Sequence, residues 1–355
     1  MTFACRQAKS SAMDVIFESR GRIGVVTLNR PQALNALTLA MVVDIDRRLT
    51  AWADDPDIAA VVIRSAGGRA FCAGGDIRAL YEAARRGDAY THDFYREEYR
   101  LNHRIKTYPK PHIALIDGIV MGGGVGLSVH GSHRVASERS VFAMPETGIG
   151  FFPDVGGTWF LPRCPGQLGT YLGLTGARLG AADMLYGSIA THHCPSDRFE
   201  SLLDDLERSS VVTEVLDRRA TDAGEPPLAQ HRAVIDRCFA ADTGEEILRR
   251  LDREPGDWAK ETAAVLRRKS PTSLKIVLRQ LRLGAELPDF AAAMRLEYRL
   301  SQRCVGSHDF LEGVRAAVVD KDQAPRWEPA TLAEVDDNTV AGFFAPLEEP
   351  DLDLG

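Results

Sequence analysis

Strand-like segments alternate with helical patterns along the first 120 residues, and this alternation constrains the fold more strongly than any other feature. Between two of these segments, residues 39–53 repeat apolar side chains at intervals of three and four, and Thr38 is placed to cap that helix. Strands separated by helices predict an α/β core. The runs rich in β-branched residues are 15–17, 23–28, 58–63 and 113–116.

The pattern changes to helices almost alone from about Ala181 onward. We therefore predict a disordered N-terminal tail over residues 1–13, a catalytic core over 14–200, a helical C-terminal region over 201–345 and a tail over 346–355. The segment after Trp327 is rich in proline and acidic residues, so we expect it to pack loosely on the surface.

Composition limits the partners of the chain. A net charge of −7 over 355 residues argues against a nucleic-acid surface and favours a small-molecule partner. The most membrane-like run, residues 111–129, contains Asp117 and several glycines, so we expect no membrane segment. The first residues lack the apolar part of a secretory signal, and the six cysteines lie far apart, without the spacing of a zinc site. These features predict a cytoplasmic protein with no metal, and the excess of arginine over lysine is typical of a GC-rich bacterial genome.

Two glycine-rich turns are candidates for binding a negative charge. Successive glycines at 122–124, followed by Gly126, expose backbone N–H groups where a helix is expected to begin, as an oxyanion hole requires. Close packing of a strand on a helix explains the same glycines equally well. The second turn, residues 71–78, follows a strand and contains Asp76, a candidate helix cap. One N–H from each turn would make an oxyanion hole with two donors. A dinucleotide-binding turn is disfavoured, because Leu127 occupies the position of the last glycine in the G-x-G-x-x-G motif.

Two carboxylates, Glu146 and Asp154, lie in the glycine-rich and aromatic segment 142–157, FAMPETGIGFFPDVGG. Apolar surroundings raise the pKa of a carboxyl group and make its ionised form more basic and more nucleophilic. Alternatively, both side chains simply hold turns together by hydrogen bonds. Other candidates are weaker, because Ser128 misses the nucleophile-elbow spacing and Cys72 has no evident histidine partner.

These segments together resemble the crotonase (enoyl-CoA hydratase/isomerase) superfamily from about residue 14 onward, and within it the 3-hydroxyisobutyryl-CoA hydrolases. Superfamily marks are LNRP at 28–31, ALNA at 33–36, FCAGGDI at 71–77 and the triple glycine. Marks of the hydrolases are REEY at 96–99, the segment 142–157, SPTSLK at 270–275 and DKDQ at 320–323.

The resemblance implies a fold, a ligand and its contacts. The expected α/β fold is a crotonase-like spiral of ββα turns with a helical C-terminal region. The thioester carbonyl is expected between the N–H groups of Gly75 and Gly123. Coenzyme A enters as part of the acyl-CoA substrate, so no separate cofactor is expected, and assembly as a trimer or dimer of trimers is implied. Residues expected along coenzyme A are Gln32, Ala33, Leu34, Ala73, Asp76 and Ile77.

One departure from the superfamily pattern narrows the implied reaction. Hydratases of this superfamily hold a water between two glutamates, and only the second is matched here, by Glu146, because Gly126 stands at the first position. Hydrolysis needs an oxyanion hole and one carboxylate. The resemblance thus implies hydrolysis of 3-hydroxyisobutyryl-CoA in valine breakdown, with Glu146 as nucleophile or general base, Asp154 binding the substrate hydroxyl or assisting proton transfer, and Glu98 in the pocket. A hydratase or isomerase that uses Asp154, and a catalytically weak acyl-CoA-binding protein, are the alternatives.

Overall fold

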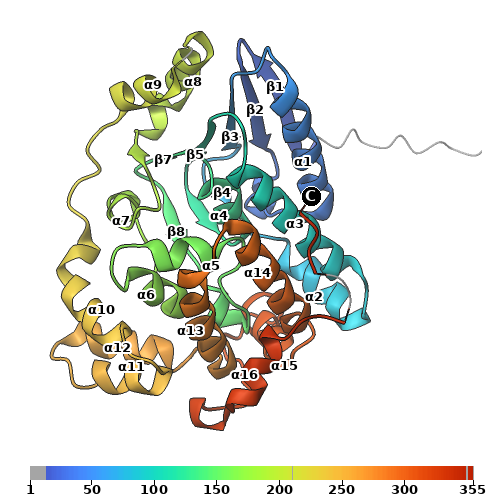
Figure 1. The fold of residues 1–355 in the computed structure, drawn as a ribbon. Helices are drawn as coiled ribbons and strands as arrows, with labels where there is room; N and C mark the ends of the chain where they lie inside the picture. The colour runs from blue at the N-terminus through green and yellow to red at the C-terminus, as the bar shows by residue number, and fades with distance from the viewer. Residues whose placement is uncertain (1–12, 210, 349–350, 355) are drawn as a thin grey trace, which may run out of the picture.

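The computed structural model describes residues 13–209, 211–348 and 351–354, and within them the core contains two sheets (Figure 1). From β3 onward, successive strands alternate between the two sheets, as the predicted ββα spiral requires. Among the strands of the described residues, β1 and β2 pair antiparallel and the other strand pairs are parallel. The larger sheet has the order β1 (Val15–Arg20), β2 (Ile23–Leu28), β3 (Ala60–Ser65), β5 (His112–Ile116), β7 (His133–Ala136) and β9 (His192–His193). The smaller has the order β4 (Ala70–Cys72), β6 (Ile119–Met121) and β8 (Val141–Ala143).

Helices connect the strands and then form the C-terminal half of the chain. The first are α1 (Leu39–Asp54), α2 (Ile77–Arg86), α3 (Tyr90–Lys106), α4 (Gly123–Ser128), α5 (Gly157–Phe160), α6 (Leu168–Thr175) and α7 (Ala181–Tyr186). Next come α8 (Phe199–Arg208), α9 (Val212–Arg219), α10 (Arg232–Phe239), α11 (Gly244–Leu251), α12 (Asp257–Leu266), α13 (Pro271–Glu286), α14 (Phe290–Cys304), α15 (His308–Val314) and α16 (Asp337–Phe344). Short 3-10 or π turns are η1 (Pro31–Ala33), η2 (Glu146–Ile149), η3 (Leu161–Arg163), η4 (Ser196–Arg198), η5 (Pro227–His231), η6 (Arg315–Val319) and η7 (Leu332–Glu334).

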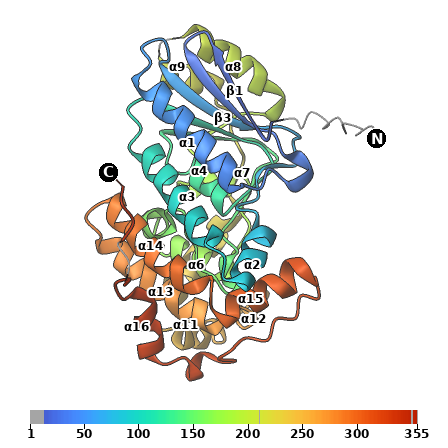
Figure 2. The ribbon, with the colours of Figure 1, turned by 90° about the vertical axis from the view of Figure 1, so that its right-hand side faces the viewer.

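The larger sheet is covered on both faces (Figure 2). Side chains alternate across a strand, so Val26 and Ile63 join the main core on the side of α1 and α3, whereas Val25 and Val62 face α8 and α9. A sheet buried on both faces needs continuous apolar strands. This explains why the strand segments are apolar runs rather than strictly alternating ones.

The predicted helix caps of the N-terminal half are present. The Thr38 hydroxyl accepts a hydrogen bond from Met41 N–H at the start of α1, and the Asp76 carboxylate accepts one from Ala79 N–H at the start of α2. Each cap satisfies an N–H group that has no partner within its helix. The positions of α1 and α2 are therefore fixed by the residues that the sequence indicated.

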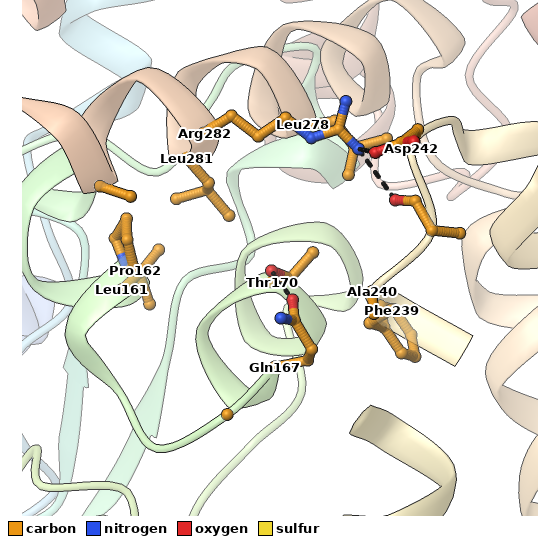
Figure 3. Close-up of a pocket in the computed structure, with 13 residues that line it drawn as sticks. Leu161, Pro162, Gln167, Thr170, Phe239, Ala240, Asp242, Leu278, Leu281 and Arg282 are labelled. Carbon is orange, nitrogen blue, oxygen red and sulfur yellow. Dashed lines mark hydrogen bonds and ion pairs between the residues drawn. The ribbon is translucent and has the colours of Figure 1, made fainter. Parts of the chain in front are cut away.

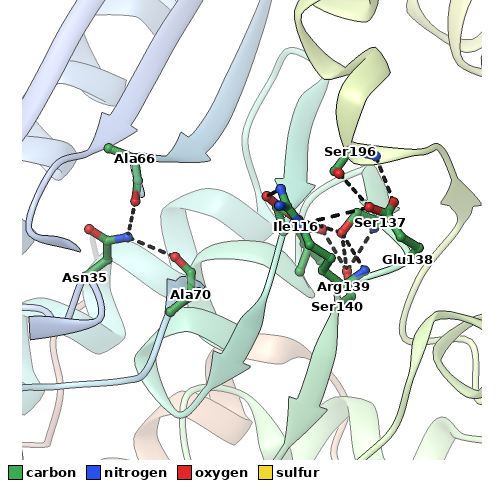
Figure 4. A network of polar contacts seen from close by, with 10 residues as sticks. Asn35, Ala66, Ala70, Ile116, Ser137, Glu138, Arg139, Ser140 and Ser196 are labelled. Carbon is green, nitrogen blue, oxygen red and sulfur yellow. Dashed lines mark hydrogen bonds and ion pairs between the residues drawn. The ribbon is translucent and has the colours of Figure 1, made fainter. Parts of the chain in front are cut away.

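A buried asparagine fixes the turn that follows β2 (Figure 4). Asn35 has a φ of 55°, and its amide nitrogen donates to Ala66 O at 3.0 Å and Ala70 O at 2.9 Å. Ala73 N–H then donates to Leu34 O at 3.1 Å, which joins this turn to the second glycine-rich turn. A separate network in the same figure ties the end of β5 to the turn between β7 and β8, where Ser140 Oγ donates to Ile116 O at 2.8 Å.

The end of the chain differs from the expectation. We predicted loose packing after Trp327, yet α16 packs against α14, and Val335 and Leu352 are buried. Arg299 also holds Asp351 through a hydrogen bond of 2.8 Å. Isolated apolar residues among prolines and acids give no periodic signal, which is why the sequence missed this packing. The predicted N-terminal tail lies outside the described residues except for Met13, which is exposed.

Candidate active site

A cavity of about 140 Å³ brings most of the predicted site residues together. Its wall includes Gly75 from the second glycine-rich turn, Glu98 from α3, and Glu146 and Asp154 from the segment 142–157. A different cavity, between α6, α13 and the end of α10 (Figure 3), has the Arg282–Asp242 ion pair at its edge and does not reach the two carboxylates of the segment 142–157. The first cavity is therefore the candidate active site. Its other lining residues are Ala73, Gly74, Ile77, Leu80, Phe94, Tyr95, Met121, Gly122, Pro145, Ile149 and Phe151.

The two glycine-rich turns meet at this cavity. Gly122 has a φ of 45° and Gly74 a φ of 105°, conformations that favour glycine. A β-carbon built on Gly74 would lie 3.6 Å from the Gly123 nitrogen, so the backbones are in contact. Gly123 is the first residue of α4, and its N–H has no partner within the helix. The two turns are thus in contact beside the cavity, which Gly75 lines and Gly123 does not, and the pairing of Gly75 and Gly123 as oxyanion donors stays a prediction.

Glu146 lies at the start of η2, beside the first residues of α4. Its carboxylate atom Oε1 is 3.6 Å from the position of a β-carbon on Gly122, and the side chain is buried. Among the described residues, its Oε2 has no hydrogen-bond partner. Burial raises the pKa of Glu146 well above its usual value, the charge of Asp154 raises it further, and the Lys269 ammonium opposes both. A buried carboxylate with an unpaired oxygen can attack a carbonyl or take a proton from water.

Asp154 is buried in the same cavity and is held by a tyrosine. Tyr99 Oη donates to Asp154 Oδ2 at 2.9 Å. Burial raises the pKa of Asp154 to about 7, although the Tyr99 hydrogen bond lowers it. Burial therefore raises the pKa of both acids in the direction that the sequence predicted, and Asp154 can hold or release a proton near neutral pH.

The elevated pKa of Asp154 predicts how Asp154→Asn changes stability. Between about pH 4 and pH 7 the folded state binds more protons at this site than the unfolded chain, so the contribution of Asp154 to the free energy of unfolding falls as pH rises through that window. We expect Asp154→Asn to raise the free energy of unfolding more near pH 8 than near pH 5, by a difference of about 2 to 3 kcal/mol. Urea unfolding at both pH values measures this difference, and an equal effect at both would contradict the assignment.

Position 126 has no room for a side chain, and the Glu98 carboxylate lies close by, next to Gly123. A β-carbon at position 126 would lie 2.5 Å from Asn102 Nδ2 and 2.9 Å from Val155 Cβ, so a longer side chain has no room there. A side chain at 126 would point back along α4 toward Gly123. The Glu98 carboxylate already lies there, with Oε1 2.3 Å from the position of a β-carbon on Gly123. A carboxyl group is thus present beside Gly123, but α3 supplies it.

The residues expected along coenzyme A are only partly in the cavity. Ala73 and Ile77 line the cavity. Gln32 and Ala33 lie in η1, and the hydrogen bond from Ala73 N–H to Leu34 O connects this turn to the cavity wall. The Asp76 carboxylate caps α2 and pairs with Arg30 at 2.9 Å, and its backbone N–H donates to Leu37 O at 2.8 Å, so these groups already have partners within the protein.

Several polar residues around Glu146 and Asp154 were not predicted. Four of them are buried on helices, and the half-buried Lys269 lies between α12 and α13. The burial of these residues depends on distant partners, so the sequence pattern alone gives no signal for them. Tyr99 was the most accessible to prediction, because it lies in the REEY segment beside Glu98. The residues are Tyr99, Asn102, Lys269, Gln280 and Glu297.

Within residues 13–209, 211–348 and 351–354, no group of three or more His, Cys, Asp or Glu side chains is placed to hold a metal ion. Five of the six cysteines lie in these ranges, and they are buried free thiols. In the same part of the chain, no helix is both long and apolar enough to cross a membrane.

Comparison with known proteins identifies the class to which this fold and site belong. Residues 23–344 match the model of the enoyl-CoA hydratase/isomerase family, and the chain belongs to that family. Curated relatives are named 3-hydroxyisobutyryl-CoA hydrolase, mitochondrial. The one from Danio rerio is 49% identical over 98% of this chain and 93% of its own length. The one from Homo sapiens is 46% identical over 96% of this chain and 91% of its own length.

Solved structures confirm the crotonase fold. A structure titled as a carnitinyl-CoA dehydratase from Mycobacterium thermoresistibile has a TM-score of 0.93 at 41% identity and covers 97% of this chain and 99% of its own. A structure titled as an enoyl-CoA hydratase from Rhodobacter sphaeroides has a TM-score of 0.90 at 44% identity. It covers 96% of this chain and 100% of its own. The likeness therefore includes the helical C-terminal region.

The comparisons correct the expected location. We predicted a cytoplasmic protein, but the curated relatives are named as mitochondrial, so that prediction is wrong. The reason is that a missing apolar segment excludes only a secretory signal and carries no information about other compartments. The vertebrate sources of these relatives also give no support to the bacterial origin that the arginine excess indicated.

Proposed function

We propose that this protein is a thioester hydrolase that converts 3-hydroxyisobutyryl-CoA and water into 3-hydroxyisobutyrate and free coenzyme A, a step of valine breakdown. The single observation that carries the proposal is the pairing of Glu146 with the α4 N-terminus, in a site where Gly126 leaves no room for a second hydratase glutamate. The names of relatives that are 46–49% identical over nearly the whole chain agree with it. Water is the only co-substrate, so we propose that no cofactor is required.

The residues of the cavity supply each part of this reaction. The N–H groups of Gly75 and Gly123 stabilise the negative charge that develops on the thioester oxygen. Ionised Glu146 either attacks the carbonyl carbon to give a mixed anhydride, which water then opens, or takes a proton from the attacking water. In both routes the C–S bond breaks and the thiolate accepts a proton. Glu98 and Asp154 both line the cavity, and we assign them to binding the substrate hydroxyl or to transferring that proton.

A hydratase reaction is the second candidate, because two similar solved structures have titles that name a dehydratase and a hydratase. Such a reaction needs a second carboxylate to share the water, and Glu98 or Asp154 would have to provide it. An acyl-CoA-binding role without catalysis is the third candidate. Three buried acids in one small cavity weaken the stability of the fold and offer nothing to simple binding, which favours catalysis.

One assay separates these candidates. The purified protein is incubated with 3-hydroxyisobutyryl-CoA and, separately, with crotonyl-CoA, while free thiol and enoyl absorbance are followed. We expect rapid thiol release from the first substrate and little loss of enoyl absorbance from the second. Water addition to crotonyl-CoA without thiol release would support the hydratase, and tight binding with neither reaction would support the binding protein. The elution volume of the same sample tests the trimer or dimer of trimers that we propose from the resemblance.

A further inference from the structure

The backbone around Asp154 is held by buried side chains from several helices. Glu297 on α14 accepts hydrogen bonds from Gly156 N–H and Thr158 N–H, both at 2.8 Å. Gln280 on α13 donates to Pro153 O at 2.7 Å and to Thr158 Oγ1 at 2.8 Å. The polar backbone groups that flank Asp154 are thus satisfied by the C-terminal helices.

Two further contacts complete this arrangement. The ring nitrogen Nε2 of His130 lies 2.6 Å from Val155 O, and Tyr99 holds the Asp154 carboxylate itself. Val155 has a φ of 47° and Gly156 a φ of 92°. A valine in the left-handed region is strained and persists only where its surroundings impose that conformation. The hydrogen bonds to residues 153–158 provide such surroundings.

We propose that Glu297 and Gln280 are positioning residues for the hydrolysis: they hold the backbone of residues 153–158 from α14 and α13 and thereby keep Asp154 in the cavity with Glu146. This inference rests on the proposed function, because it assigns the two residues a role in that reaction. It also gives the helical C-terminal region a part in catalysis, although the cavity wall itself comes from residues 73–154.

Packing alone gives no reason for an acid at position 297. Glu297 is completely buried, and burial raises its pKa to about 8, while the charge of Asp154 raises it and the two N–H bonds lower it. An amide or apolar side chain would avoid this cost. Other titratable groups that interact with Asp154 are Tyr95, Glu98 and Tyr99 on α3, Glu146 on η2 and Cys304 on α14.

The test compares Glu297→Gln with the wild-type protein in the thiol-release assay. An amide nitrogen cannot accept a hydrogen bond, so one N–H of the segment loses its partner. We expect kcat to fall about 10- to 100-fold, with KM within about threefold and the thermal midpoint unchanged or raised. In an Asp154→Asn background, the same substitution should change kcat by less than about threefold, because the carboxylate that Glu297 positions is absent.

Two further variants make the result decisive. Ser301→Ala is the matched control, since Ser301 is buried on the same helix but donates to Tyr298 O and not to the segment, and it should leave kcat unchanged. Gln280→Leu should lower kcat as Glu297→Gln does, and it carries the test if the latter does not fold. The inference would be overturned if Glu297→Gln and Gln280→Leu both kept the wild-type kcat. It would also be overturned if Glu297→Gln lowered kcat equally in the wild-type and Asp154→Asn backgrounds. Absence of thiol release from the wild-type protein would instead contradict the proposed function.

Discussion

Glu146→Gln is expected to lower kcat for thiol release from 3-hydroxyisobutyryl-CoA by about 10³-fold or more. The amide has the shape of the carboxylate but can neither attack the carbonyl nor take a proton from water. The oxyanion donors are backbone groups and stay in place, so KM should change little. Steady-state kinetics with free-thiol detection measures both constants.

The control for this substitution is Glu138→Gln. Glu138 lies outside the cavity and accepts hydrogen bonds from Ser196, so this variant removes a glutamate charge without touching the site. Its kcat should equal that of the wild-type protein. Thiol release by Glu146→Gln within about threefold of the wild-type rate would mean that another group performs the reaction, and the assigned mechanism would fail.

Gly126→Glu is expected to destabilise the protein without creating a hydratase. The new β-carbon would meet Asn102 and Val155 at distances that no real β-carbon tolerates, and the new carboxylate would be buried beside Glu98. Overpacking and an unpaired buried charge together should lower the free energy of unfolding by about 3 kcal/mol. Because Val155 follows Asp154, thiol release should fall as well. Urea unfolding and the two substrate assays measure these effects.

Alanine substitutions separate the effect of steric overlap on stability from the effect of the added charge. Gly126→Ala introduces the β-carbon without the charge and should still lower the free energy of unfolding by about 1–3 kcal/mol. Gly342→Ala, in α16, meets no atom within 4 Å and should raise stability by up to about 1 kcal/mol, because alanine favours a helix. Asn102→Ala should restore part of the stability of Gly126→Glu. Hydration of crotonyl-CoA by a stable Gly126→Glu protein would show that the missing glutamate alone separates the two activities.

Local signals in the sequence predicted the core well. The apolar strand runs, the Thr38 and Asp76 caps and the helix that begins at the triple glycine all depend on residues close together in the chain, and the structure contains each of them. The apolar residues of the segment 142–157 predicted raised pKa values for Glu146 and Asp154, and burial raises both. Such features need no knowledge of tertiary contacts.

The supporting residues of the site could not be predicted in this way. Glu297 is 141 residues from Gly156, and a glutamate within a helical pattern usually faces solvent. Only the folded chain shows that two backbone N–H groups satisfy it. The approach of Glu98 to Gly123 has the same origin, because it depends on how α3 packs against α4.

The most direct test of the central claim is the identity of the products. The wild-type protein is incubated with 3-hydroxyisobutyryl-CoA in water enriched in ¹⁸O, and the mixture is analysed by mass spectrometry. Hydrolysis predicts free coenzyme A and 3-hydroxyisobutyrate that carries ¹⁸O in its carboxyl group, in equal amounts. Formation of the dehydrated enoyl thioester, with coenzyme A still attached, would contradict the assignment of this site to thioester hydrolysis.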